Sequence, residues 1–409
     1  MGTKVVVTGM GVVSPVGNTV SAFWESLCAG RSGVHAITHF ETADLPTRFG
    51  GVVDEVVPEG MTPKDLRRAD LYTVYAIEAA NQAWRQSGLD ISAENPYRCG
   101  VLVGSGIGGI ETIHAEGIQF HLHGPKRISP LMVPKGLANM ASGVIAIRLG
   151  LQGPNKAVVT ACATGTHCIG DAAALIRAGK ADIMLAGGAE AALNRFGIAG
   201  FGAMRAISRR NDAPERASRP FDKDRDGFVL ADGAGVLVLE SEMHARRRGA
   251  AILGEIAGMG ETCDAFHITA PREDGTGAAE AMRLALAEAQ MNPGDIGYYN
   301  AHGTSTQHND PMECRALYAV FGDTMPPASS TKSMTGHLLG AAGAIEAIAC
   351  LLAIRDGVLP PSINYDTPDP ECPLNLVANE ARETRVAFAM SNSLGFGGHN
   401  ASIIVKNYG

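Results

Sequence analysis

Short apolar runs alternate with alanine-rich runs along almost the whole chain of 409 residues. Runs such as KVVVTG, CGVLVGSG and ADIMLAGGAE have the length of buried strands, whereas TVSAFWESLCAG and IGDAAALIRAG have the spacing of amphipathic helices. Strands that alternate with helices pair in parallel, because each helix returns the chain to the same end of the sheet. The pattern predicts an α/β protein, and 50 glycines are available for tight turns between strand and helix.

The alternation begins again near residue 250 and continues to the last run, ASIIVKN. Two short echoes keep their order along the chain. TGMG at 8–11 resembles AGMG at 257–260, each expected at a strand end, and the run at 162–179 resembles the run at 332–357. We therefore predict a duplicated fold with halves at 1–250 and 251–409. The polar stretch at 217–235 is expected to be an ordered loop.

Composition and charge argue against several classes of protein. No apolar run reaches the roughly 20 residues that span a bilayer, and MGTKVVVTGMG is typical of a first strand rather than of a secretion signal. The formal net charge of −8 argues against binding of nucleic acid. The eight cysteines form no CxxC pair, so we expect neither a zinc site nor a disulfide framework, but reduced thiols in a cytoplasmic protein.

Cys162 stands where the apolar run of VVTACATGTHC gives way to small residues. Many cysteines at strand ends are only small buried side chains. Here a helix is expected to begin at or just after Cys162, and its N-terminal N–H groups and partial positive charge favour a thiolate with a lowered pKa. The neighbours Ala161, Ala163 and Gly165 allow a sharp turn and leave room for a thioester substrate. We predict that Cys162 is a nucleophile whose turn points N–H groups at an oxyanion.

Three further residues have the chemistry to assist such a nucleophile. NAHGTSTQHND places His302 after a strand, and STKSMTGHLLGAAG places Lys332 and His337 on another loop at a strand end. Parallel α/β proteins place their sites at strand ends, so we expect these side chains to meet. A lone histidine is more often structural, and we assign His167 and His308 to supporting or surface positions.

Two glycine-rich segments allow a ligand or a moving loop to lie close to the backbone. VLVGSGIGGIE has the GxGxxG spacing of a dinucleotide-binding turn, but the segment that follows offers no second strand with an acidic residue. We therefore expect only a turn that another backbone or a ligand approaches closely. In SNSLGFGGHN, glycines flank Phe396, which is either an ordinary core residue or a gate over a pocket.

Together these motifs resemble those of the β-ketoacyl–acyl carrier protein synthases, and most nearly those of the type II enzymes of bacterial fatty-acid synthesis. The resemblance covers nearly the whole chain, from VVVTGMGVVSPVGN to the last strand, and rests on TACATG, NAHGTST, STKSMTGH and GFGGHN. It implies the thiolase fold, a duplicated five-layered α/β/α/β/α structure, and a homodimer. The duplicated fold agrees with the duplication that the two echoes predict.

The resemblance also implies a reaction. Cys162 would accept an acyl chain from acyl carrier protein, and His302 and His337 would stabilise the enolate formed when malonyl carrier protein loses carbon dioxide. The enolate would then attack the acyl group, a decarboxylative Claisen condensation that gives a 3-oxoacyl product. Backbone N–H groups of Cys162 and Phe396 would form the oxyanion hole, and Lys332 would hold the site together or aid acylation. No cofactor is implied, because the substrates travel on the phosphopantetheine arm of the carrier.

Further positions match the family's binding residues. Those expected at the substrate are Ile107, Thr269, Thr304, Thr306 and Phe396. Those matching a site for a structural monovalent cation are Asn300, Glu346, Ser391 and Asn392. Those expected to form a local basic surface for the acidic carrier protein are Lys64, Arg67, Arg68, Lys126, Arg127 and Arg205.

Three alternatives share part of this pattern. A thiolase needs a second active-site cysteine near the C-terminal glycine loop, and SNSLGFGGHN has none. A non-catalytic chain-length partner lacks the nucleophile, which is present here. A ketosynthase of a type II polyketide or aryl-polyene pathway uses the same chemistry and stays open. Two departures, Leu131-Met132 where aromatics are expected and Gln307-His308 after GTST, leave the preferred acyl-chain length open.

Overall fold

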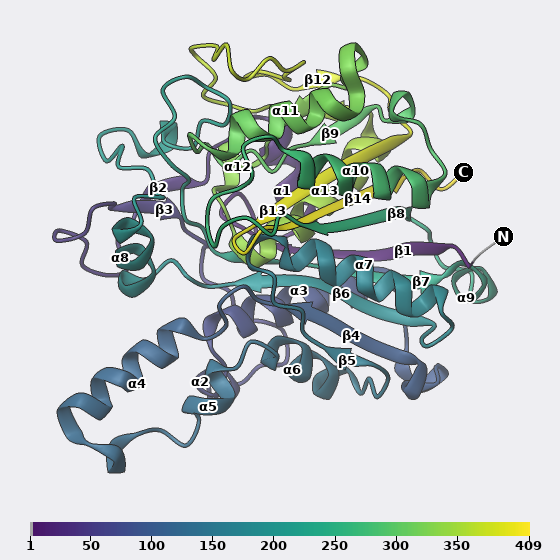
Figure 1. The fold of residues 1–409 in the computed structure, drawn as a ribbon. Coiled ribbons are helices and arrows are strands. Elements are labelled where there is room, and N and C mark those ends of the chain that lie inside the picture. Colours follow the sequence, from purple (N-terminus) through teal and green to yellow (C-terminus); the bar gives the residue numbers. More distant parts are fainter. Residues whose placement is uncertain (1–2) are drawn as a thin grey trace.

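The computed structural model describes residues 3–409, which build a ten-stranded sheet covered by helices (Figure 1). The first part of the chain contributes β1 (Val5–Val13), β4 (Cys99–Gly104), β5 (Asn155–Lys156), β6 (Ile183–Glu190) and β7 (Gly233–Ser241). The second part contributes β8 (Gly254–Cys263), β9 (Tyr298–Asn300), β10 (Ala328–Ser329), β13 (Phe388–Gly395) and β14 (His399–Lys406). Two small antiparallel pairs lie outside it: β2 (Val34–Ala36) with β3 (Phe49–Gly51), and β11 (Val358–Leu359) with β12 (Arg382–Glu383).

The two parts arrange their strands in the same order. From the middle of the sheet outwards the orders are β1-β7-β6-β4-β5 and β8-β14-β13-β9-β10. In each part the first strand is therefore followed by the fifth, fourth, second and third. The inner pairs are antiparallel and the outer pairs parallel in both parts, and β1 joins β8 as an antiparallel neighbour. The repeat is that of a duplicated fold, while the division at residue 250 stays a prediction.

Thirteen helices accompany the sheet in the part of the chain that the structure describes. In the first part they are α1 (Val20–Cys28), α2 (Pro63–Arg68), α3 (Leu71–Ser87), α4 (Ile110–His123), α5 (Met132–Gly136), α6 (Met140–Leu149), α7 (Thr164–Arg177), α8 (Arg195–Ala203) and α9 (Glu242–Arg247). In the second part they are α10 (Thr276–Ala289), α11 (Asn309–Phe321), α12 (Lys332–Thr335) and α13 (Ala342–Asp356). Over residues 3–409, none of the helices has the length and apolarity needed to cross a membrane.

The hydrophobic core divides into layers. α7 and α13 pack in one cluster with strands of both parts, including Leu102 of β4 and Ile403 of β14. On β4 the neighbours Val101 and Val103 point to the opposite face, where α3 and α6 cover them. α10 and α11 cover the opposite face of the second part in the same way. The layers follow the order α/β/α/β/α, and the predicted five-layered duplicated fold is confirmed.

Contrary to the prediction, the similar segments TGMG and AGMG do not lie at strand ends. Their glycines are instead explained by packing. Both segments lie inside strands β1 and β8 rather than at strand ends. A Cβ on Gly11 would come within 1.9 Å of the carbonyl oxygen of Ala79 in α3, and a Cβ on Gly260 within 2.0 Å of that of Ala281 in α10. The glycines therefore let α3 and α10 lie directly against the equivalent strands of the two parts.

Two runs that begin like strands, AVVTAC and ASSTKS, form little or no strand. β5 ends at Lys156, so AVVTAC (157–162) lies wholly beyond the ladder, whereas in ASSTKS (328–333) the ladder ends at Ser329 before α12 begins. In both places side chains bind the backbone N–H groups: Thr164 Oγ1 accepts from Thr160 N–H, and Ser362 Oγ accepts from Ser330 N–H. Such local bonds compete with the sheet ladder and turn the chain into the site.

Candidate active site

A cavity of about 690 Å³ brings most of the predicted site residues together. It lies beyond the ends of β4, β9 and β13, as expected for an α/β sheet. The predicted residues that line it are Ile107, Cys162, Arg205, Thr269, His302, Thr304, Thr306, His337 and Phe396.

Cys162 lies at the centre of a short 3₁₀ turn, Ala161–Ala163, and α7 begins two residues later at Thr164. Ala161 adopts φ of +50°, a left-handed backbone that a side chain rarely takes. The loop after β13 lies directly on this turn, because a Cβ on Gly395 would come within 2.7 Å of the Thr160 carbonyl oxygen. Cys162 is thus fixed by a strained turn and by the glycine loop that packs against it.

The thiol of Cys162 is not the low-pKa group that the sequence predicts. Burial raises its pKa to about 12, while Lys332 and the Phe396 N–H, which donates to the sulfur, act in the opposite direction. The prediction was wrong because the loss of hydration outweighs the effect of the helix N-terminus. At neutral pH the resting residue is therefore a thiol.

His302 and His337 lie edge to face, with ring centroids 5.4 Å apart and planes at 86°. Burial and the nearby Lys332 hold the pKa of both rings well below the ordinary value, so both are neutral. The Lys332 ammonium lies 3.4 Å from Nδ1 of His302, which must then accept, so the ring carries its proton on Nε2. A neutral imidazole with a defined N–H can donate to a developing enolate oxygen.

Lys332 is buried behind the histidines rather than in the cavity wall. Its ammonium donates to Glu346 Oε1 at 2.5 Å, and both side chains are almost completely buried. Burial raises the pKa of Glu346, and Lys332 opposes this rise. This arrangement suits the electrostatic role expected for Lys332, because its other contact fixes the tautomer of His302.

Glu313 on α11 is a supporting residue that the sequence analysis missed. Its carboxylate accepts from the N–H groups of His302 and Gly303, each at 2.8 Å, and from the Tyr299 hydroxyl at 2.8 Å. It therefore fixes the backbone on which the His302 ring stands. An acidic residue inside a helical run usually indicates a solvated face, so the sequence carried little signal for it.

Glu190 at the end of β6 was also missed. It accepts from the N–H groups of Gly106 at 2.7 Å and Gly340 at 3.1 Å, and from the Ser105 hydroxyl at 2.7 Å. It joins two loops of the cavity wall, one from each part of the sheet. A carboxylate also occupies N–H groups of the GxGxxG turn that a dinucleotide phosphate would need, which favours the structural interpretation of those glycines.

The residues expected at the substrate occupy different walls. The hydroxyls of Thr304 and Thr306 are 3.0 Å apart, and Thr269 lies on a separate loop, where its N–H donates to His267 Nδ1 at 3.1 Å. Ile107 and Phe396 are partly exposed and line the same cavity. The cavity thus offers a polar wall from Thr269, Thr304 and Thr306 beside apolar contacts.

The four residues expected at a cation are all buried, and one of them, Glu346, pairs with Lys332. Asn300 on β9 is the register partner of Ser391 on β13. Among the described residues, Asn300 Oδ1, Ser391 Oγ and Glu346 Oε2 have no hydrogen-bond partner. Unpartnered amide, hydroxyl and carboxylate oxygens fit a hard monovalent cation. Groups of three or more His, Cys, Asp or Glu suited to a transition metal are absent from residues 3–409.

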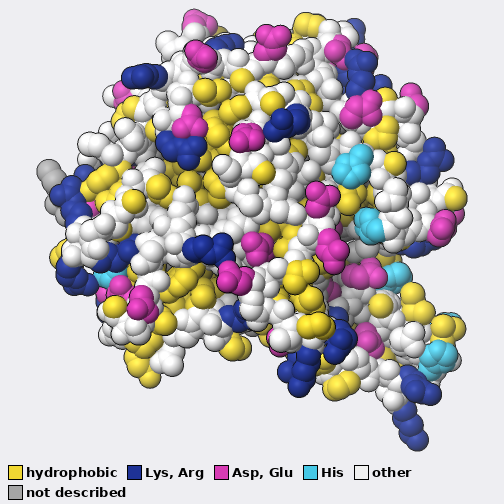
Figure 2. All heavy atoms as spheres, turned by 180° about the vertical axis from the view of Figure 1, so that it is seen from behind, with side chains coloured by type: hydrophobic (Ala, Val, Ile, Leu, Met, Phe, Trp, Pro, Cys, Tyr) yellow, Lys and Arg dark blue, Asp and Glu magenta, His cyan; other side chains and the backbone are white. Residues whose placement is uncertain are grey.

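The six basic residues expected at the carrier protein are all exposed, but they do not share one element. Arg205 lines the cavity. Lys64, Arg67 and Arg68 lie on α2, while Lys126 and Arg127 follow α4, which forms an arm that projects from the body (Figure 1). Figure 2 shows basic side chains at the end of this arm and acidic side chains scattered over the rest of that face.

Two family models match the chain. The model described as the N-terminal domain of β-ketoacyl synthase matches residues 2–245, and that of the C-terminal domain matches residues 253–366. A relative from Vibrio cholerae, named 3-oxoacyl-[acyl-carrier-protein] synthase 2, is 50% identical over 408 residues, covering 98% of this chain and 99% of the relative. A protein of the same name from Coxiella burnetii is 48% identical, with 98% of each chain covered.

Solved structures agree with the fold. The ishigamide ketosynthase/chain length factor superimposes with a TM-score of 0.93 at 38% identity, and a β-ketoacyl synthase from Burkholderia phymatum with 0.93 at 36% identity. A type II polyketide acyl-carrier protein in complex with its ketosynthase superimposes with 0.92 at 35% identity. In all three, both chains are covered completely.

Proposed function

The chain belongs to the β-ketoacyl synthase family, and from this we propose how its site elongates an acyl chain on acyl carrier protein. It is an acyltransferase, a 3-oxoacyl-acyl carrier protein synthase of fatty-acid biosynthesis. The observation that carries the mechanism is the meeting of a buried cysteine and two neutral histidines in one cavity.

The first step loads Cys162. Its sulfur attacks the thioester carbonyl of the incoming acyl carrier, the bond from that carbonyl to the pantetheine sulfur breaks, and the thiol proton ends on the pantetheine sulfur. The Phe396 N–H already donates to Cys162, so with the Cys162 N–H it is positioned to stabilise the oxyanion.

The second step makes and uses the nucleophilic carbon. The bond from the malonyl α-carbon to its carboxylate breaks, carbon dioxide leaves, and the electron pair remains as an enolate that accepts hydrogen bonds from His302 and His337. The enolate carbon attacks the acyl carbonyl, and Cys162 leaves as a thiolate that regains a proton. Decarboxylation supplies the carbanion, so the residues present suffice without a strong base or a cofactor.

We propose that Thr269, Thr304 and Thr306 bind the pantetheine arm and that Ile107 and Phe396 stand at the mouth of the acyl pocket. The six basic residues would contact the acidic carrier protein. Asn300, Glu346, Ser391 and Asn392 would hold a monovalent cation, which would supply positive charge beside Glu346.

We also propose a homodimer in the cytoplasm. β5 is an edge strand of the sheet, and the apolar side chains of Ile147 and Val159 beside it are 80% and 53% exposed. An apolar edge of this kind is stabilised by a second copy of the chain. The eight cysteines are all unpaired, as in a reducing compartment.

One experiment tests the reaction. Purified protein is incubated with acyl carrier proteins loaded with chains of graded length, and then with malonyl carrier protein. We expect acylation of Cys162, release of carbon dioxide and a product longer by two carbons after one condensation. A product that grows by several unreduced condensations would favour the polyketide alternative, and absence of an acyl-enzyme would contradict the proposal.

A further inference from the structure

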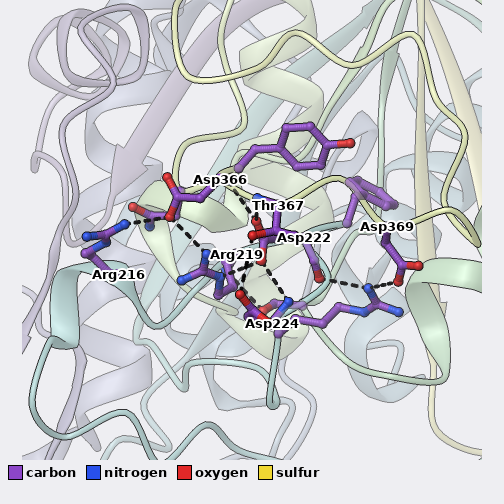
Figure 3. Close-up of polar contacts among 12 residues, drawn as sticks. Arg216, Arg219, Asp222, Asp224, Asp366, Thr367 and Asp369 are labelled. Carbon is purple, nitrogen blue, oxygen red and sulfur yellow. Dashed lines mark hydrogen bonds and ion pairs between the residues drawn. The ribbon is translucent and has the colours of Figure 1, made fainter.

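The polar stretch at 217–235 forms an ordered loop, as expected, and Figure 3 shows its Arg219 and Asp222 beside Asp366, Thr367 and Asp369. Within it, the buried carboxylate of Asp222 accepts from Arg219 Nε at 3.0 Å and from the N–H of Thr367 at 2.7 Å. Arg219 also donates to Asp366 at 3.0 Å. Complementary charges thus join this loop to residues 366–369 near the end of the chain.

Arg225 is the member of this network that reaches the cavity wall. Its side chain is 1% exposed, and its Nε donates to the carbonyl oxygen of Thr306 at 2.9 Å. Its Nη1 donates to Asp369 at 2.5 Å and to the carbonyl of Asp222 at 2.8 Å. The carboxylate of Asp310 lies 3.8 Å from Nε. The guanidinium is therefore held in one orientation by partners from three segments.

The segment 304–306, which Arg225 holds, has one face at the cavity and the other against Arg225. The hydroxyls of Thr304 and Thr306 are 3.0 Å apart at the cavity, whereas the Thr306 carbonyl receives Arg225. Between the two threonines, Ser305 adopts φ of +67°, which a serine rarely takes without support. That support comes from the same loop, since Gly227 N–H donates to the Ser305 carbonyl and Arg219 N–H to the Ser305 hydroxyl.

We infer that Arg225 is a positioning residue for the arm that carries the substrate. It fixes the Thr306 peptide so that both threonine hydroxyls project into the cavity, and it acts only through this peptide. The inference rests on the proposed function, in which Thr304 and Thr306 bind the pantetheine arm. Arginine suits the place because its planar fork serves a carbonyl, a carboxylate and a second carbonyl at once, which a single ammonium cannot do.

The test replaces Arg225 with lysine, which keeps the charge beside Asp310 and Asp369 but loses the fork. We expect the KM for malonyl carrier protein to rise about fivefold to tenfold, the loss of one or two positioned hydrogen bonds, with kcat within about twofold. Alkylation of Cys162 by iodoacetamide, which needs no arm, should be unchanged. Arg216→Lys is the matched control, because Arg216 pairs with Asp366 and makes no bond to residues 304–307.

The possible outcomes distinguish a positioning role of Arg225 from a purely structural role. They also distinguish failure of this inference from failure of the proposed function. A structural role predicts lower thermal stability, lower kcat and altered alkylation with KM unchanged, and that result would overturn the inference. A KM unchanged in Arg225→Lys while wild-type Cys162 is acylated overturns it as well. Failure of wild-type acylation instead overturns the proposed function. If Arg225→Lys does not fold, Ser305→Ala removes the bond from Arg219 to the same segment, and a wild-type KM there counts against the inference.

A double variant provides a sharper readout. Thr306→Ala removes one of the hydroxyls that Arg225 is inferred to position, so it should raise the KM by itself. Adding Arg225→Lys should then raise the KM by a smaller factor than it does in the wild-type chain, because part of its effect is already lost. Effects that multiply fully would show that Arg225 acts independently of Thr306.

Discussion

The turn that carries Cys162 has a counterpart in the second part of the molecule. Residues 161–163 and 339–341 both form a 3₁₀ turn directly before a central helix, α7 in one part and α13 in the other. Each turn begins with a non-glycine residue in the left-handed region, Ala161 at φ of +50° and Leu339 at +45°. Each follows the third strand of its part. The duplication has therefore preserved a strained backbone as well as a strand order.

The middle residue distinguishes the two turns. It is Cys162 in the first and Gly340 in the second. A Cβ on Gly340 would lie 2.5 Å from the Gly106 nitrogen and 2.9 Å from Glu190 Oε2, and the Gly340 N–H donates to Glu190. The first turn thus presents the proposed nucleophile to the cavity, whereas the second turn closes the cavity wall. The catalytic groups that we propose for the second part are instead His302 and His337.

The largest loss of activity is expected when the side chain that distinguishes the first turn is removed. Cys162→Ala should abolish condensation, by more than about 10⁴-fold, because no other group can carry the acyl chain. The fold should be retained, since alanine fits the turn. Mass spectrometry after incubation with acyl carrier protein should show acylation at Cys162 in the wild type and none in the variant. Stable acylation of Cys168 or Cys350 in the variant would contradict the assignment.

The contribution of the second part can be isolated in a chain without a nucleophile. Cys162→Gln should decarboxylate malonyl carrier protein without condensation, because the amide resembles the acyl-enzyme. His302→Ala in that background should lower carbon dioxide release by about 10²-fold to 10³-fold through loss of an enolate donor. The rate is measured as radioactive carbon dioxide from labelled malonyl carrier protein. Undiminished release would remove His302 from the catalytic set.

The burial of the first turn can be measured through the titration of its thiol. The pKa of Cys162 is raised to about 12, so the reactive thiolate should increase about tenfold per pH unit from pH 7 to 9 without a plateau. The rate of iodoacetamide alkylation at Cys162 reports this slope. Lys332 lowers the pKa, so Lys332→Met should slow alkylation at every pH in this range. A plateau below pH 8 would instead restore the low-pKa thiolate expected from the sequence.

The second turn can be tested by giving it a side chain. Gly340→Ala should lower the free energy of unfolding by about 1–3 kcal/mol, because its Cβ meets backbone and the Glu190 carboxylate. Gly117→Ala is the control: a Cβ there has no atom within 4 Å, and alanine in the helix α4 should stabilise by up to about 1 kcal/mol. Urea unfolding measures both. A neutral Gly340→Ala would show that the second turn is not closed by packing.

The sequence allowed us to predict the fold class and the meeting of the proposed catalytic residues in one cavity, because parallel strands collect their following loops at one end of the sheet. Cys162, His302 and His337 each follow such a strand and meet in the cavity. Glu190 and Glu313 could not be found in this way, since a carboxylate that binds buried N–H groups has no distinctive spacing. The pKa expected for Cys162 was wrong, because the pKa depends on the depth of burial, which only the packed structure determines.

The smallest effect concerns Phe396 in the loop that packs on the first turn. Phe396 is only partly buried, and Gly397 and Gly398 beside it adopt φ of +85° and +79°. A gate predicts that Phe396→Ala changes the free energy of unfolding by less than about 1 kcal/mol, whereas a core aromatic would cost about 3–5 kcal/mol. Because the gate would delay malonyl entry until Cys162 is acylated, the variant should release several times more carbon dioxide without an acyl donor. A large stability loss, together with one Phe396 position in crystals of the free and acylated protein, would identify a static wall instead.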